Sequence, residues 1–168
     1  VHARKAWLNG LSPKENRTVP PLRYDDVHRL KRERPNLSIE INGGLVTLDE
    51  VAEHLQAVDA VMIGRAAYDD PMSFADADAR FFSAVNSGLD RFEVVEAMVP
   101  YVAEHLARGG KLHHVTRHML TLFRRQPGGK KWRQILSSES FKPDQDETML
   151  LSALEVVRQA HERRAAAA

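Results

Sequence analysis

Hydrophobic positions follow two different spacings along residues 20–70. Tyr24, Val27 and Leu30 recur at helical spacing, and residues 37–41 alternate apolar and polar side chains as a strand does. A second apolar stripe at helical spacing and a second short apolar run come next: Leu48, Val51, Leu55 and Val58, then residues 60–63. Helix, strand, helix and strand with short links predict βαβ units and a parallel sheet.

Charged and polar residues mark the ends of these predicted helices. Residues 25–26 are both Asp and residues 31–32 are Lys and Arg, which is the order that the helix dipole favours. Thr47 and Glu50 have the spacing of a capping box at the start of the second helix.

Strand patterns stop beyond about residue 85, and helical stripes replace them. Asp90 and Glu93 form a second capping-box pair, and Gly109-Gly110 ends the helix that follows, despite Pro100 inside it. The apolar stripes are Phe92, Val95, Val99, Val102 and Leu106; Leu112, Val115, Met119 and Leu122; Trp132, Ile135 and Leu136; and Met149, Leu150, Leu154 and Val157. We therefore predict an α/β part over residues 1–84 and an all-helical bundle over residues 85–168.

The amino-acid composition limits the number of domains, the possible chemistry and the expected location of the protein, but it does not indicate a function. The 168 residues are 43% hydrophobic, which suits one ordinary domain or two small ones, and the formal net charge is only +1. With no cysteine, disulfides, thiolate metal sites and a cysteine nucleophile are excluded within the chain. Apolar runs are too short for a membrane span and no secretory h-region opens the chain, so a cytoplasmic location is the default expectation. Because the chain opens at Val1 without a methionine, we expect it to be a piece of a longer protein.

Glycines follow both predicted strands, at Asn42-Gly43-Gly44 and at Gly64-Arg65. Residues just past the carboxyl ends of parallel strands face the ligand in α/β folds. Glycine lets a backbone approach an anion closely, and the guanidinium of Arg65 can bind a phosphate with two hydrogen bonds. The pattern indicates a phosphate-binding site, although the glycines could instead serve only to make tight turns.

Two further segments could face the same ligand. His2 stands at what reads as the end of an earlier strand, although a lone histidine in such a place is more commonly structural or solvated. The loop at residues 11–17 carries Lys14 and Arg17, which we expect near the mouth of the ligand site.

A local excess of positive charge is hidden by the neutral total. Residues 105–138 contain no Asp or Glu but eight Lys and Arg: Arg108, Lys111, Arg117, Arg124, Arg125, Lys130, Lys131 and Arg133. Such a run can be a solvated face, but separating positive from negative charge is unfavourable unless an anion binds, and an extended basic face suits a nucleic acid. His113, His114 and His118 lie in the same window, and their spacing without a nearby carboxylate does not indicate a metal site.

Four stretches resemble the C-terminal part of tRNA-dihydrouridine synthases of the A-type subfamily. They are "VHARKAWLNGLSPKENRTVPPLRYDDVHRLKRERP", "EINGG", "DAVMIGRAAYDDP" and "LFRRQPGGKKWRQILS", and together they span most of residues 1–137. The resemblance implies the C-terminal part of an FMN-binding (β/α)8 TIM barrel followed by a helical domain that helps to hold tRNA. It also implies that the enzyme is monomeric at full length.

The resemblance also assigns roles to individual residues. The positions that match family contacts to FMN, chiefly its phosphate and ribityl end, are His2, Asn42, Gly43, Gly44, Gly64 and Arg65. The positions that match tRNA contacts are Lys14 and Arg17 in the loop and Lys130 and Arg133 in the helical part.

The implied reaction is the reduction of D-loop uridines, in this subfamily uridines twenty and twenty-a, with FMN as cofactor and NADPH as reductant. The family's catalytic cysteine belongs to the first half of the barrel, so no catalytic residue is expected in this chain and the chain alone is expected to be inactive. Two alternatives stay open: a phosphate-binding TIM-barrel enzyme of another class, such as an isomerase or aldolase of phosphorylated sugars, or a non-catalytic tRNA-binding module.

Overall fold

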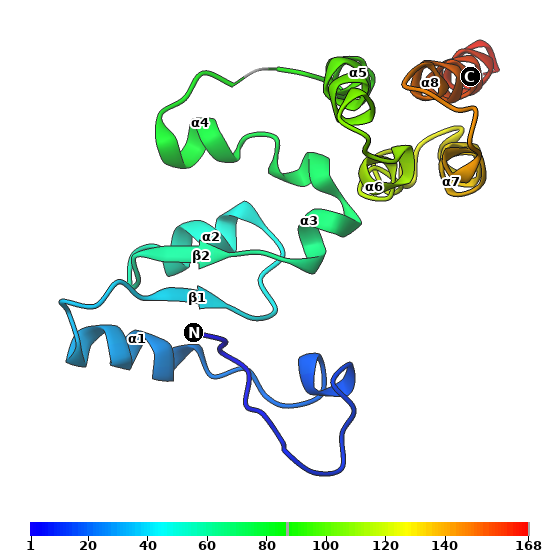
Figure 1. Cartoon of the computed structure of the whole chain (residues 1–168). Helices are drawn as coiled ribbons and strands as arrows, with labels where there is room; N and C mark the ends of the chain where they lie inside the picture. Colours follow the sequence, from blue (N-terminus) through cyan, green and yellow to red (C-terminus); the bar gives the residue numbers. More distant parts are fainter. Residues whose placement is uncertain (87, 168) are drawn as a thin grey trace. The chain divides into compact units, whose positions relative to one another are not determined.

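The computed structural model describes residues 1–86 and 88–167, and the chain divides into two compact units, Val1–Ala67 and Tyr68–Ala168 (Figure 1). The first unit contains the strands of the chain and the second is built from helices. Among the described residues, no helix has both the length and the apolar character needed to cross a membrane.

The first unit is built around two parallel strands. Strand β1 (Glu40–Asn42) pairs with β2 (Ala60–Met62), and Asn42 lies opposite Met62 in the register. Helix α1 (Tyr24–Glu33) precedes β1, and α2 (Leu48–His54) connects the two strands (Figure 1). The predicted order of helix, strand, helix and strand is confirmed.

The start of the chain lies along the other edge of β1. His2 forms a parallel bridge with Asn42, and the backbone N–H of Ala3 donates to the Asn42 carbonyl at 2.7 Å. The segment then leads through a loop containing the 3-10 helix η1 (Glu15–Arg17) and returns to α1. The core of this unit contains the buried residues Ala3, Val27, Ile39, Ile41, Leu45 and Val58.

The predicted start of α2 is confirmed by its capping box, whereas β1 starts later than predicted because of a tertiary contact. Thr47 accepts from the Glu50 backbone N–H and Glu50 accepts from the Thr47 backbone, so the predicted capping box is present. The predicted strand at residues 37–41 begins only at Glu40, because the N–H of Ile39 donates to the Asp59 carboxylate at 2.8 Å and Leu37 is exposed. Helix α2 ends at His54, so Leu55 lies just beyond it.

The second unit contains only helices among its described residues. They are α5 (Arg91–Ala107), α6 (Leu112–Thr116), α7 (Gly129–Ser138) and α8 (Thr148–Ala166), preceded by the end of α3 (Arg65–Asp69), η2 (Pro71–Phe74) and α4 (Ala77–Phe82), with η3 (Glu139–Phe141) after α7. The capping box of Asp90 and Glu93 starts α5, as predicted, and α5 continues through Pro100. The predicted helical character of this part is confirmed.

The stripe at Leu112, Val115, Met119 and Leu122 is buried along its whole length, but the helix covers only its first half. Helix α6 ends at Thr116, and turns carry the chain onward. The Met119 carbonyl accepts a hydrogen bond from Nε1 of the buried Trp132 at 2.8 Å. The same carbonyl also accepts from the Leu122 backbone N–H at 3.1 Å, so it has one partner in the turn and one on α7.

Residues 68–84 fold with the second unit, although the sequence analysis placed them with the first part. Met72 packs against the helical core, and the Arg91 guanidinium lies 3.5 Å from the Asp70 carboxylate. Arg124 forms a further ion pair with Asp69 at 3.1 Å. These contacts join residues far apart in sequence, so a local pattern does not reveal them. The binding roles assigned to the two parts stay predictions.

Candidate functional site

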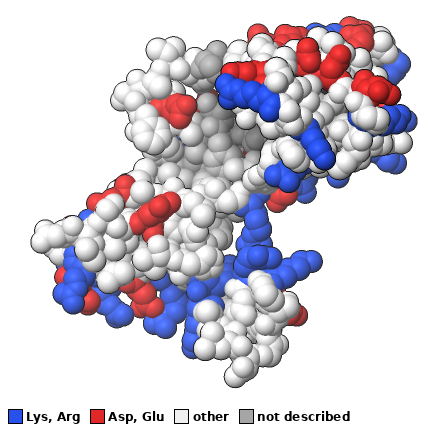
Figure 2. Space-filling view, viewed as in Figure 1, with Lys and Arg blue, Asp and Glu red and all other residues white. Residues whose placement is uncertain are grey.

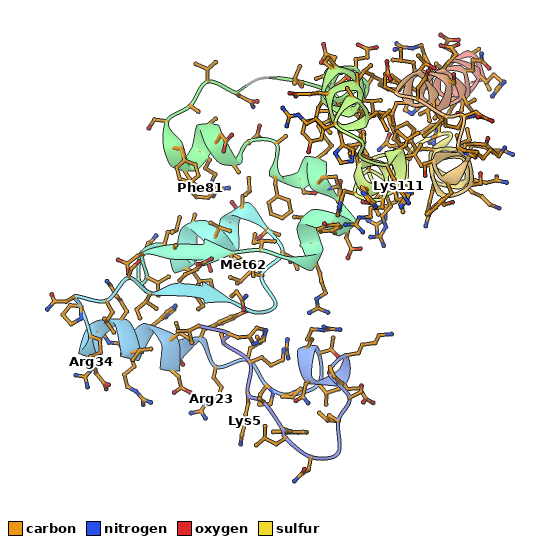
Figure 3. The ribbon with its side chains drawn as sticks, in the orientation of Figure 1. Lys5, Arg23, Arg34, Met62, Phe81 and Lys111 are labelled. Carbon is orange, nitrogen blue, oxygen red and sulfur yellow. The ribbon has the colours of Figure 1, made fainter. Side chains whose placement is uncertain are left out.

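Three chain segments of the first unit end side by side. His2 is bridged to Asn42, and Asn42 is in register with Met62, so the carboxyl ends of the N-terminal segment, β1 and β2 form one edge. Met62, labelled in Figure 3, marks the end of β2, two residues before Gly64. The predicted neighbourhood of the two glycine turns is therefore present.

The turn after β1 needs glycine at both positions. Gly43 has a φ of +121° and Gly44 a φ of +77°, which other residues rarely adopt. A Cβ on Gly44 would also lie 2.8 Å from a Leu22 methyl carbon. Gly64 differs, because a Cβ there would meet nothing within 4 Å, so this glycine keeps space open at the end of β2. The tight turn that was the simpler interpretation is real, and it exposes the backbone at the edge.

Asn42 presents an unused hydrogen-bond acceptor at this edge. Its Nδ2 donates to the sulfur of Met62 at 3.2 Å, but its buried Oδ1 has no partner. A buried oxygen without a donor is costly, and a ligand hydroxyl or N–H would satisfy it. A ligand rich in hydroxyl groups would provide such donors.

Arg65 begins α3 directly after Gly64 and is exposed. One guanidinium nitrogen, Nη2, donates to the Arg17 carbonyl at 3.2 Å. The contact links the η1 loop to the edge at which β2 ends. The other guanidinium N–H groups have no partner in the described part of the chain and are free for an anion.

The η1 loop carries Lys14 and Arg17, both exposed. Asn16 fixes the loop, because its side chain both accepts from the Trp7 backbone N–H and donates to the Trp7 carbonyl, each at 2.9 Å. Figure 2 shows Lys and Arg atoms gathered over this part of the first unit. The contact between the Arg17 carbonyl and Arg65 brings Arg17 to the end of β2, whereas the place of Lys14 at the mouth of the site stays a prediction.

Tyr24 supports the glycine turn from behind, a role that sequence reasoning missed. Its hydroxyl donates to the Gly43 carbonyl at 2.8 Å. Burial raises the pKa of Tyr24, with a further contribution from the Glu50 carboxylate, so the hydroxyl stays protonated and able to donate. The Tyr24 ring also packs edge-on against His54, at 4.5 Å between centroids.

His54 and His28 complete this buried network. His28 Nε2 and His54 Nδ1 are 2.9 Å apart, so one nitrogen donates and the other accepts. Burial lowers the pKa of His54, and the neighbouring His28 lowers it further. A neutral pair can share one hydrogen bond, whereas two protonated rings would both be donors. The network therefore favours a neutral His54 imidazole behind the glycine turn.

We predict that Tyr24→Phe weakens the glycine turn without unfolding the unit. The change leaves the Gly43 carbonyl without its donor, which costs about 1 kcal/mol, so cofactor affinity should fall roughly threefold to fivefold. Fluorescence titration with FMN, the cofactor that the resemblance in sequence implies, measures the effect. The matched control is Tyr101→Phe on α5, an exposed tyrosine. Equal FMN affinities of Tyr24→Phe and the unmodified protein would contradict the supporting role.

The basic window of the second unit is partly neutralised in three dimensions. Arg108 pairs with Glu104, just outside the window, and Arg124 pairs with Asp69. The window's other cations have no ion pair within the described residues: Lys111, Arg117, Arg125, Lys130, Lys131 and Arg133. We expected all eight cations of the window to lie apart from acidic side chains. This expectation is wrong for Arg108 and Arg124, and the other six have no ion pair within the described residues.

Lys130 and Arg133 lie one turn apart on α7 and are both exposed. Their spacing places them on the same side of the helix. The face of the second unit visible in Figure 2 carries both positive and negative side chains. The predicted tRNA contact therefore depends on a local group of cations and not on an entirely basic unit.

A hollow of about 400 Å³ in the first unit has His2 among its lining residues. It runs beside residues 1–5 and α1, and is lined by side chains including Arg23, Asp26 and Leu30. It does not include the glycine turns.

The first unit is thus an α/β unit whose parallel strands end at one shared edge, where Asn42, the glycine turns and Arg65 lie. In α/β folds this is the edge at which ligands commonly bind. The sequence model of the dihydrouridine synthase (Dus) family matches residues 1–160, and the chain belongs to this family. The family resemblance expected from the sequence motifs is confirmed.

The individual relatives are tRNA-dihydrouridine(20/20a) synthases. The chain is 50% identical to the protein of Synechocystis over 155 residues, which are 92% of the chain and 46% of the relative. It is 50% identical to the protein of Shewanella oneidensis over 142 residues, 84% of the chain and 42% of the relative. It is 48% identical to the protein of Escherichia coli K12 over 157 residues, 94% of the chain and 46% of the relative. The chain therefore spans less than half the length of these relatives.

Proposed function

We propose that this chain is part of a flavin-dependent tRNA-dihydrouridine synthase that reduces uridines 20 and 20a of the D-loop. The observation that carries the proposal is the shared edge of the three segments ending at His2, Asn42 and Met62, in a chain of the Dus family. In this proposal the first unit is the C-terminal part of a TIM barrel, and the second unit holds tRNA.

The residues at the edge fit FMN by their chemistry. In the proposal the turn of Gly43 and Gly44 and the free N–H groups of Arg65 hold the phosphate, because they combine close backbone approach with a positive charge. Asn42 Oδ1 accepts from a ribityl hydroxyl, and His2 lies beside the turn, with its Cε1 carbon 3.5 Å from where a Gly43 Cβ would be. When bound, FMN supplies the hydride chemistry, with NADPH as the reductant.

This chain's residues orient the cofactor and the RNA. Lys14 and Arg17 would contact tRNA phosphates beside the site, and Lys130 and Arg133 would contact tRNA from the second unit. A uracil base leaves its stack to reach such a site, so the RNA must be held firmly while the base is extruded. The chain has no cysteine, so in the proposal the residue that protonates the uracil ring lies outside it.

The test is made with the protein at its natural length and an unmodified tRNA transcript. We expect purified protein to bind FMN and, with NADPH, to convert uridines at positions 20 and 20a to dihydrouridine, which mass spectrometry of RNA fragments detects. Binding of tRNA without dihydrouridine in the presence of FMN and NADPH would favour a non-catalytic tRNA-binding module. Turnover of a phosphorylated sugar without flavin binding would favour the other class of barrel enzyme.

We predict that Arg65→Gln weakens FMN binding more than it weakens tRNA binding. Loss of a charge-assisted contact to a phosphate should raise the dissociation constant of FMN roughly tenfold, while tRNA affinity stays within about twofold. Fluorescence quenching of FMN and tRNA filter binding measure the two constants. Arg32→Gln on the exposed surface of α1 is the control and should leave both unchanged. Unchanged FMN affinity in Arg65→Gln would remove Arg65 from the phosphate site.

A further inference from the structure

A group of protonatable and positive side chains surrounds α6, apart from Lys130 and Arg133. We call it the α6 cationic face, and it comprises His105, Lys111, His113, His114 and Arg117. The rings of His113 and His114 lie 4.5 Å apart between centroids, and His105 lies 6.1 Å from His114. Lys111, at the start of α6, is labelled in Figure 3.

No acidic side chain balances this face within the described residues. The elements packed against α6 carry four acids, Glu93, Glu96 and Glu104 on α5 and Glu139 on η3. Each has a partner: Glu104 pairs with Arg108, Glu139 with Lys142 at 2.6 Å and Glu96 with Arg158, while Glu93 accepts from the Asp90 N–H in the capping box. Lys111 and Arg117 have no ion pair, although the Arg117 Nε donates to His118 at 3.0 Å. The face is therefore a site of mutual repulsion that an anion would relieve.

In addition to desolvation, the lowered pKa of His114 has the same cause, the positive charge around α6. Desolvation lowers the pKa of His114, and so do its neighbours His113, Arg117, His105 and Lys111, while no carboxylate raises it. His114 is itself exposed. An anion docked here would oppose these positive charges and raise the pKa of the imidazole.

An aromatic surface adjoins the cations. The Phe141 ring is 63% exposed and stacks on His113, with centroids 4.4 Å apart and planes tilted by 16°. Proteins use flat aromatic surfaces beside cations to stack on the bases of RNA while the cations bind its phosphates. A small inorganic anion has no ring that could stack on such a surface. In the described part of the chain no three His, Asp or Glu side chains could hold a metal ion. RNA therefore fits the face better than a metal or a free phosphate.

We propose that the α6 cationic face docks phosphates of bound tRNA and that His114 takes up a proton when it does so. The inference rests on the proposed function and adds to it a second RNA contact, in addition to Lys130 and Arg133. Because the proton is gained on binding, tRNA affinity rises as the pH falls. The change is steepest between the lowered pKa of the free imidazole and its raised pKa in the complex.

The experiment measures tRNA affinity against pH in the protein at its natural length. Between about pH 7.5 and about pH 6 we expect tRNA binding to tighten roughly threefold to fivefold through this group. His114→Gln should flatten this dependence while leaving affinity near pH 8 within about twofold. His161→Gln on α8 is the matched control and should keep the dependence of the unmodified protein. Equal pH dependence in His114→Gln and the unmodified protein would overturn the proton uptake.

Salt dependence tests the phosphate contact separately. The double variant Lys111→Gln and Arg117→Gln should reduce the slope of log affinity against log salt by roughly one to two, because each phosphate contact contributes about 0.9. Arg163→Gln with Arg164→Gln, exposed near the end of α8, is the control and should leave the slope unchanged. An unchanged slope in the first pair would overturn the contact. If the unmodified protein bound no tRNA, the proposed function itself would fail, whereas normal binding with unaffected variants would remove only this inference.

Discussion

Trp132→Ala is expected to lower the free energy of unfolding of the second unit by about 3 to 5 kcal/mol. Trp132 on α7 is completely buried, and its ring lies 5.0 Å from that of Phe123 in an edge-to-face contact. Its Nε1 donates to the Met119 carbonyl, which lies in the turns that follow the end of α6 at Thr116. Truncation removes the ring packing, opens a cavity and takes away one of the two hydrogen bonds of this carbonyl, which then keeps only the bond from the Leu122 N–H.

Urea unfolding followed by circular dichroism measures the loss. The matched control is Trp7→Ala, because Trp7 is 41% exposed in the first unit and the chain has only these two tryptophans. We expect the control to cost less than about 1 kcal/mol. A second variant, Trp132→Phe, retains much of the volume and should fall between the two. Similar losses in Trp132→Ala and Trp7→Ala would show that Trp132 does not hold the helices together.

Features set by neighbouring residues could be predicted from the sequence. The capping boxes of Thr47 with Glu50 and of Asp90 with Glu93 are both formed, because three residues of spacing are enough to bring their atoms together. The parallel pairing of β1 and β2 also followed from the order of elements, since a helix between adjacent strands makes them parallel. The glycine turn was found for the same reason, and its positive φ angles agree with the residue type.

Features set by distant residues could not be predicted. Tyr24 was interpreted only as part of an apolar stripe, but its hydroxyl reaches Gly43, 19 residues along the chain. The pair of His28 and His54 and the ion pair of Asp69 with Arg124 likewise depend on the folded chain. A tyrosine at the buried side of a helix before an Asn-Gly-Gly turn was the signal available, since a buried hydroxyl needs a partner. The division at Ala67 was missed because contacts of residues 68–72 decide it.

The partial neutralisation of the basic window changes which residues deserve to be tested for RNA binding. Arg108 and Arg124 already have carboxylate partners, so replacing either would expose an unpaired acid as well as remove a cation. Lys130 and Arg133 have no such partner within the described residues, and both are exposed on α7. A substitution at these two positions can therefore change the affinity for RNA without breaking an ion pair within the described part of the protein.

Reversing both charges, Lys130→Glu with Arg133→Glu, is expected to weaken tRNA binding about a hundredfold at moderate salt, a loss of about 2.7 kcal/mol. The reversal removes two phosphate contacts and places two negative charges against the RNA backbone, so the slope of log affinity against log salt should also fall by roughly two. FMN affinity should stay unchanged, because the predicted cofactor residues all lie in the first unit.

The control for this variant is Arg163→Glu with Arg164→Glu, which changes the net charge of the same unit by the same amount at the exposed end of α8. Filter binding at several salt concentrations compares the two, and thermal melts confirm that both remain folded. A comparable loss in the control would mean that tRNA senses the total charge of the second unit and not a contact on α7. Since nucleic-acid affinity depends so strongly on phosphate contacts, the difference between the two pairs is the direct test of the proposed contact between α7 and the RNA.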